Sequence, residues 1–139
     1  MGLDNGIYWK PRNDKEKNVD FPDYVVFNYD SLENEYEVCY WRKCFGLRGR
    51  IFDIIDNATK VEVDGEECGY ELIRADLVQI QQMLIDYLRY PDRWDEENNY
   101  WCFNDMKQNL MQNIINLGWM IDYMRLENPM AFVYFLDSY

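Results

Sequence analysis

The chain contains no histidine among its 139 residues, and serine and threonine are nearly absent: serine occurs at Ser31 and Ser138, and threonine at Thr59 alone. Without histidine there can be no Ser-His-Asp or Cys-His catalysis and no His-ligated zinc centre, and the commonest general base near neutral pH is missing. A hydroxyl nucleophile is equally hard to place. The sequence therefore favours a non-enzymatic role, and it predicts no catalytic residue and no cofactor.

Positive charge is also scarce, with 14 Lys and Arg against 26 Asp and Glu and a formal net charge of -12. This balance opposes binding to duplex nucleic acid or to an anionic membrane, because both reward a basic surface. No segment approaches the roughly 18 consecutive apolar residues of a membrane span, and the start "MGLDNGIYWK" lacks a signal-peptide pattern. We expect a cytoplasmic protein whose partner is a basic protein.

Paired cysteines are missing as well. A four-cysteine zinc site needs thiols at knuckle spacing, and Cys39, Cys44, Cys68 and Cys102 form no CxxC pair. No stretch has the alternating acids and turn glycine of a calcium loop. We predict no metal site. A carboxylate-bound magnesium ion or a glycosidase-type carboxylate pair stays open, because nothing in the spacing selects particular acids.

What the chain does have is apolar and aromatic side chains, which make up 48% and 17% of its residues. That content is sufficient for a hydrophobic core, and the length predicts a single domain over residues 1–139. The pattern predicts an α+β fold with a small antiparallel sheet and about three helices. The strands are expected at 5–9, 23–29, 35–41, 60–63, 66–73 and 130–139, and the helices at 43–56, 75–90 and 104–126.

Two patterns predict which side chains are buried. In the strand 35–41, strict alternation places Tyr36, Val38 and Tyr40 on one face, opposite Glu35, Glu37, Cys39 and Trp41. The apolar stripes of the last two helices are expected in the core, and the strand 130–139 is apolar enough for the sheet interior. The stripe residues are Leu77, Ile80, Leu84, Leu88, Leu110, Ile114, Leu117 and Ile121.

The stretch "CYWRKCFGLRGR" gathers positive charge beside aromatic rings in this acidic chain. The arginines could pair with acids such as Asp53 or Asp56, the cluster could hold a phosphate, nucleotide or single strand, or it could be a protein-contact hot spot. We expect Arg48 and Arg50 to be the principal contacts, with Trp41 as the flat surface. The candidate anion- or partner-binding residues are Trp41, Arg42, Lys43, Arg48 and Arg50.

Cys44 and Arg50 also match the C-x5-R spacing of cysteine phosphatases, in which backbone amides and an arginine hold phosphate near a thiolate. The glycines stand elsewhere than in the usual CxxGxxR, and Ile51 follows Arg50 where Ser or Thr is normal. A phosphate- or nucleotide-binding protein, or a phosphatase-like enzyme using this loop, is therefore the alternative function.

The opening "MGLDNGI" and the block "CYWRKCFGLRGRI", 20 of the 139 residues, resemble stretches of short uncharacterised proteins encoded by bacteriophages and prophages. The resemblance implies a small phage-type protein working inside a bacterial host cell. Small acidic phage proteins often resemble inhibitors of host defence nucleases, some of which mimic nucleic acid with carboxylates. The resemblance implies no functional residue.

Together these observations predict a small acidic binding protein, a phage-encoded inhibitor of a bacterial nucleic-acid-handling or defence complex of the CRISPR type. It would act by protein contact or nucleic-acid mimicry, and complementary charge would speed its encounter with a host nuclease or ribonucleoprotein. The candidate acidic residues lie on the hairpin expected from the strands at 60–63 and 66–73 and in the loop between the last two helices. They are Glu62, Asp64, Glu66, Glu67, Asp92, Asp95, Glu96 and Glu97.

Overall fold

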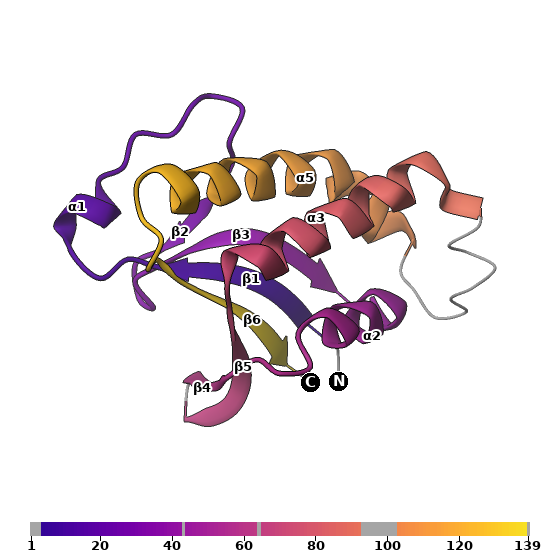
Figure 1. The fold of residues 1–139 in the computed structure, drawn as a ribbon, viewed down its shortest axis with the longest axis horizontal. Helices are drawn as coiled ribbons and strands as arrows, with labels where there is room; N and C mark the ends of the chain where they lie inside the picture. Colours follow the sequence, from indigo (N-terminus) through magenta and orange to yellow (C-terminus); the bar gives the residue numbers. More distant parts are fainter. Residues whose placement is uncertain (1–3, 43, 64, 93–102, 139) are drawn as a thin grey trace.

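The structure, a computed structural model, describes residues 4–42, 44–63, 65–92 and 103–138. The strands are β1 (Asp4–Lys10), β2 (Asn28–Asp30), β3 (Glu35–Arg42), β4 (Lys60–Val63), β5 (Glu66–Leu72) and β6 (Phe132–Ser138). The helices are α1 (Asp14–Lys17), α2 (Phe45–Ile54), α3 (Arg74–Arg89) and α5 (Phe103–Leu126). Along the chain these elements follow the order β1, α1, β2, β3, α2, β4, β5, α3, α5, β6 (Figure 1).

The strands form one antiparallel sheet in the order β2-β3-β1-β6-β5-β4, which confirms the predicted α+β class. The first and last strands pair in the middle of the sheet, Asp4 opposite Ser138 and Lys10 opposite Phe132. β6 therefore lies between β1 and β5, in the interior position predicted from its apolar sequence. No helix in the described ranges is both long and apolar enough to cross a membrane.

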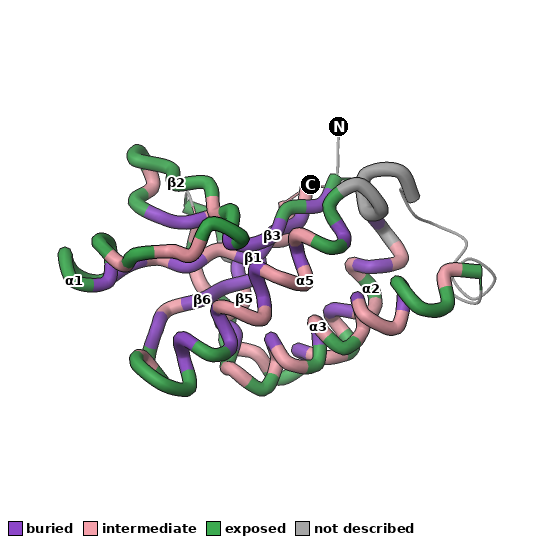
Figure 2. The backbone as a smooth tube through the Cα atoms, turned by 90° about the horizontal axis from the view of Figure 1, so that it is seen from above, coloured by how far each residue is buried: buried purple, intermediate pink, exposed green. Residues whose placement is uncertain are grey.

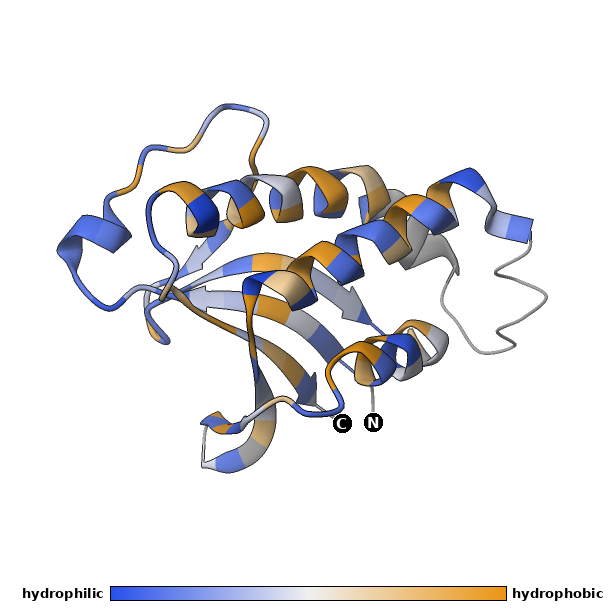
Figure 3. Cartoon of the chain, viewed as in Figure 1, coloured by the Kyte–Doolittle hydropathy of each residue, from blue (hydrophilic) through white to orange (hydrophobic). Residues whose placement is uncertain are grey.

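The longer helices pack on one side of the sheet, which we call the helix face (Figure 1). Trp9 of β1 contacts the rings of Trp119 and Tyr123 on α5, at centroid distances of 6.3 and 5.1 Å. Phe52 of α2 packs edge-on against Phe135 of β6. Figure 2 shows buried residues along the central strands and at intervals along α3 and α5, and Figure 3 shows the matching alternation of hydrophobic and hydrophilic residues along these helices.

The stripe predictions hold for most positions. Six of the eight predicted positions are buried: Leu77, Ile80, Leu84, Leu110, Leu117 and Ile121. Ile114 is only partly buried, and Leu88, 44% exposed, was predicted wrongly. Near the end of α3 the inward position belongs to Tyr87 instead, which lies three residues after Leu84, and the additional 100° of helical rotation carries Leu88 away from the sheet.

The alternation predicted for β3 is wrong, because the strand contains a β-bulge. Ile7 pairs with Cys39 and Tyr8 with Glu37, so Val38 is an extra residue without a counterpart on β1. The bulge reverses the alternation beyond it. Tyr36, Val38, Cys39 and Trp41 are buried, whereas Tyr40 is exposed.

The predicted strand 23–29 is wrong for its first five residues, since β2 begins only at Asn28. The backbone of Val26 is bonded instead by a side chain of α5. Asn116 Oδ1 accepts from Val26 N at 3.0 Å, and Asn116 Nδ2 donates to Val26 O at 2.9 Å. The side-chain amide of Asn116 thus makes the two backbone hydrogen bonds that a neighbouring strand would make.

Two leucines on one helix allow a matched test of this packing. Leu84→Ala should lower the free energy of unfolding by about 2–5 kcal/mol, because the leucine side chain is 0% exposed and its truncation leaves a cavity in the core. Leu88→Ala, the same chemical change at an exposed position, should cost about 0.5 kcal/mol or less. Urea unfolding of both variants measures the difference, and equal losses would contradict the orientation of α3.

Candidate functional site

The face of the sheet opposite the helices contains a concave acidic cavity of about 340 Å³. No described helix packs against it. We call this cavity the open-face groove. Its lining comes from β1, β2, β3, β4, β6 and the turn between β2 and β3: Tyr8, Asn28, Tyr29, Asp30, Glu33, Glu35, Glu37, Val63, Tyr134 and Leu136.

Two glycines permit the close approaches that shape this groove. A Cβ on Gly6 would lie 2.7 Å from Cε2 of Tyr8 and 2.9 Å from the carbonyl oxygen of Cys39. A Cβ on Gly69 of β5 would lie 2.6 Å from Cγ2 of Val61 and 2.9 Å from Cγ2 of Val63. Glycine at position 69 thus leaves room for the side chains of Val61 and Val63 on the neighbouring strand β4, and Val63 lines the groove.

Glu35 lies at the centre of the groove's polar network. It is buried, and its Oε2 accepts a hydrogen bond from the hydroxyl of Tyr134. Burial raises the pKa of Glu35, an effect that the Tyr134 hydrogen bond and the charge of Lys10 oppose in part. The carboxyl is therefore more costly to ionise here than in water, and a nearby cation would favour its ionised form.

Glu37 follows on the same face of β3. Burial raises its pKa also, against a lowering by the hydrogen bond from Asn28 Nδ2 at 3.4 Å. The ring of Tyr8 stacks on that of Tyr134 with centroids 5.6 Å apart. Burial, followed by the charges of Glu37 and Glu35, raises the pKa of Tyr8, so this phenol stays neutral.

A second pairing of a tyrosine with a carboxylate lies where the end of β3 meets the start of β1. Tyr40 donates a hydrogen bond to Asp4 Oδ1 at 2.7 Å, and burial together with that carboxylate raises the pKa of Tyr40 to about 12. A smaller cavity of about 60 Å³ adjoins the groove and is lined by Lys10, Glu33 and Glu62 among others. Glu62 is thus the one acid predicted from sequence that the structure places beside the groove.

Two of the other predicted acids have side chains that the structure describes, and neither lines the groove. Glu66 and Asp92 are exposed. Asp64, Asp95, Glu96 and Glu97 lie outside the described residues, as does the side chain of Glu67. Sequence reasoning missed the groove acids, although Glu35 and Glu37 alternate with apolar residues in "EYEVCYW", a pattern that identifies an exposed face of a strand.

Of the alternatives left open for the basic cluster, the structure favours pairing of an arginine with an acid over an exposed binding site. Trp41 is 1% exposed, so its proposed role as a flat binding surface is wrong: the bulge in β3 turns it into the core. Arg42 is exposed, Lys43 lies outside the described residues, and Arg50 is half-buried. Cys44 is buried at the start of α2, which argues against attack on a phosphate by its thiol.

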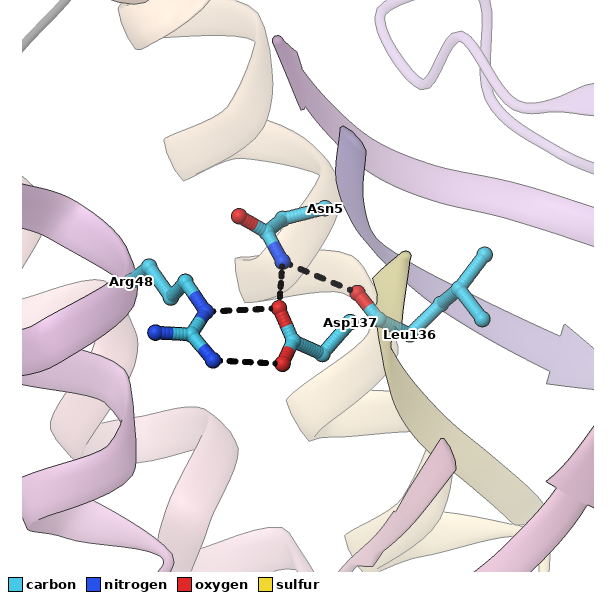
Figure 4. Close-up of polar contacts among 4 residues, drawn as sticks. All are labelled: Asn5, Arg48, Leu136 and Asp137. Carbon is cyan, nitrogen blue, oxygen red and sulfur yellow. Dashed lines mark hydrogen bonds and ion pairs between the residues drawn. The ribbon is translucent and has the colours of Figure 1, made fainter. Parts of the chain in front are cut away.

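Arg48 braces α2 against the end of β6 (Figure 4). Its Nε and Nη2 donate to Oδ1 and Oδ2 of Asp137 at 2.7 and 2.8 Å, and the guanidinium carbon lies 4.9 Å from the ring centroid of Phe52. Asn5 Nδ2 also donates to Asp137 Oδ1, at 2.8 Å. The bidentate partner of Arg48 is therefore Asp137, which is distant in sequence and was not among the acids named as candidate partners.

No group of three or more metal-ligating side chains capable of holding an ion occurs among the residues that the structure describes. Comparison with models of known protein families finds no match, and searches of curated proteins and of solved structures also find none. The groove's chemistry is thus the basis for a functional assignment.

The Arg48 brace predicts a loss of stability on substitution. Arg48→Gln should lower the free energy of unfolding by about 1.5–3 kcal/mol, because Asp137, whose side chain is 9% exposed, loses a bidentate charged partner. Arg12→Gln removes the same charge from an exposed position and should change little. Thermal and urea unfolding compare the two, and equal stabilities would reject the brace.

Glu35 predicts a distinctive dependence of stability on pH. Its pKa is raised in the folded protein above the usual value of about 4.3, so the folded state binds this proton more tightly than the unfolded state. Ionisation therefore reduces stability as the pH rises from the unfolded to the folded pKa. Glu35→Gln, which can still accept from Tyr134, should be more stable than the parent at pH 7 and similar to it near pH 4.

The control for this measurement is Glu127→Gln, which neutralises an exposed glutamate after α5. Its stability relative to the parent should be nearly constant over the same range. Urea midpoints recorded between pH 4 and pH 7 give the comparison, and a Glu35→Gln variant less stable than the parent at pH 7 would contradict the assigned burial.

Proposed function

We propose that the chain is a non-enzymatic binding protein whose open-face groove receives basic side chains of a partner protein. The observation that supports this most is the convergence of Asp30, Glu33, Glu35 and Glu37 in one concavity beside tyrosine rings. Acids of one sign in a cleft with low-dielectric walls focus the negative potential of the whole protein.

A cation in the groove would relieve costs that the folded protein otherwise bears. Glu35 and Glu37 are held where their ionised forms are unfavourable. A positive charge a few ångströms away favours ionisation and so binds more strongly than it would to exposed acids. Lys10, whose charge already lowers the pKa of Glu35, is an example of this effect within the chain.

Arginine suits the groove better than lysine. Its planar guanidinium donates two parallel hydrogen bonds to a carboxylate and stacks on aromatic faces, and the partly exposed ring of Tyr8 supplies such a face beside Glu35 and Glu37. The partner would therefore present arginine-rich surface, as proteins that bind nucleic acid do. A net charge of -12 would steer the encounter with such a partner.

The setting implied by the resemblance to phage proteins extends the proposal. In that setting the chain would inhibit a bacterial nucleic-acid-handling or defence complex, such as a host nuclease or ribonucleoprotein, by occupying basic surface that otherwise contacts nucleic acid. The alternative, phosphate or nucleotide binding at the basic cluster, has less support, because Arg48 already bonds Asp137 and Trp41 is buried.

Affinity for a defined basic probe tests the groove. A fluorescein-labelled octa-arginine peptide should bind the parent chain, and Glu35→Gln/Glu37→Gln should weaken that binding by about tenfold or more, equal to roughly 1.4 kcal/mol. The salt dependence should also become shallower, because fewer charges meet in the complex. Fluorescence anisotropy at several salt concentrations gives both quantities.

The matched control is Asp53→Asn/Asp56→Asn, which removes the same two charges from exposed positions in and after α2. This variant should keep the parent's affinity to within about twofold. If the two double variants bind equally weakly, the peptide senses only net charge, and the groove has no special role.

A further inference from the structure

The outer edge of β3 is only partly paired. β2 pairs with Glu35, Tyr36 and Glu37, and no described strand pairs with the remaining residues of β3, 38–42, on that side. A strand edge of this kind presents backbone N–H and C=O groups to which another extended chain can bond. The edge lies beside α5, which crosses the sheet above β3 (Figure 1).

Side-chain amides of α5 already hold an extended backbone at this edge. Asn116 bonds both N and O of Val26, and its Nδ2 also donates to Val38 O at 2.9 Å, which joins segment 24–26 to β3. Gln112 Nε2 donates to Tyr24 O at 2.9 Å. The chain itself thus shows how this helix replaces a partner strand.

The row of amides continues toward the start of α5. Asn109, Gln112, Asn113 and Asn116 are spaced by three and four residues, so they lie on one side of the helix. Together with Glu37, Tyr40 and other residues of the β3 edge they line a cavity of about 160 Å³. Val26, Gln112 and Asn116 line this cavity too, so it adjoins segment 24–26.

Asn113 is the residue that points to a ligand. Its side chain is 4% exposed, and its Nδ2 has no hydrogen-bond partner among the residues that the structure describes. A buried amide hydrogen without an acceptor loses its bonds to water and gains none in return, so such groups are rare without a reason. Cys39 Sγ, 3.9 Å from Asn113 O, places this residue directly against the β3 edge.

We infer that the β3 edge over residues 39–42, with Asn113 and Asn109 of α5, binds an extended peptide segment of a partner protein by strand addition. The peptide backbone would pair with β3, and a peptide carbonyl would accept from Asn113 Nδ2, as Val26 O does from Asn116. The surface is distinct from the open-face groove but contiguous with it, because Glu37 and Asn28 line both cavities.

The chemistry of the occupant follows from these neighbours. Backbone bonding requires an extended segment with free N–H groups, hence without proline at the paired positions. Glu37 favours a basic side chain beside the cavity, while exposed Val26 offers apolar contact. A segment alternating lysine with valine meets both conditions.

The test uses a capped octapeptide of alternating valine and lysine and the same peptide with each backbone nitrogen methylated. Both have the same side chains and charges, but only the first has N–H donors. The unmethylated peptide should bind at least about tenfold more tightly, because the methylated peptide cannot donate backbone hydrogen bonds to β3. It should also slow hydrogen exchange at the amides of Tyr40 and Arg42 in the parent chain.

Asn113→Leu, similar in size and without a buried amide, should fold and should lose most of this preference for the unmethylated peptide. Equal binding of the two peptides without protection at Tyr40 and Arg42 would overturn the inference, because the binding would then depend on side chains alone. Failure of the unmethylated peptide to bind at millimolar concentration would overturn it too. Both readouts report backbone pairing, so either result leaves the groove proposal to be judged separately.

Discussion

The bulge in β3 determines which side chains face the helices, and the two faces of the sheet acquire their different characters from it. In a regular strand without the bulge, strict alternation would place Tyr36, Val38 and Tyr40 on one face. Trp41 would then lie on the opposite, solvent-facing side with Glu35 and Glu37. With the bulge, Tyr36, Val38, Cys39 and Trp41 all reach the core, and Glu35, Glu37 and Tyr40 remain on the other side. The hydrophobic gain of burying a tryptophan stabilises this register.

The functional proposals follow from the face that the helices leave uncovered. A sheet covered on one side must make its second face compatible with water, and this chain does so with tyrosines and carboxylates rather than with scattered polar residues. Because the sheet is curved, Val63 of β4 and Glu33 of the β2–β3 turn line the same cavity. Glu33 is thereby brought together with Asp30, Glu35 and Glu37. Concavity makes them a binding surface instead of a solvated face.

Helix α5 has two roles that depend on its two sides. Its apolar and aromatic residues, such as Leu117 and Trp119, pack on the helix face of the sheet. Its amide row bonds the backbone of segment 24–26 and lines the cavity beside the β3 edge. The helix therefore fixes the core and prepares an edge for strand addition through one rigid element.

Much of the fold could be predicted from sequence, because periodicity is a local property of each element. The stripe from Leu77 to Leu84, the interior position of β6 and the adjacent strands β4 and β5 follow from such patterns. The bulge could not be predicted, since a single inserted residue depends on the pairing with β1. The Asp137 partner of Arg48 could not be predicted either, because those residues meet only through the sheet order.

The candidate site was harder to predict than the fold, because convergence of acids is a tertiary property. Glu35 and Glu37 could be placed on one face of a strand, yet their proximity to Glu33, Tyr8 and Tyr134 depends on the order of β3, β1 and β6. For the basic cluster, pairing of the arginines with acids was one of the alternatives that the sequence left open. The local concentration of charge and aromatic rings did not reveal that Trp41 is buried or that the partner of Arg48 is Asp137.

The most direct test of the account is an NMR titration of the chain, labelled in its tyrosine and tryptophan rings, with an arginine-rich peptide. If the open face is the binding surface, the ring signals of Tyr8 and Tyr134 should shift progressively to saturation, while those of Trp9 and Trp119 on the helix face stay nearly constant. Shifts confined to the helix-face rings, or none at saturating peptide, would contradict the central claim.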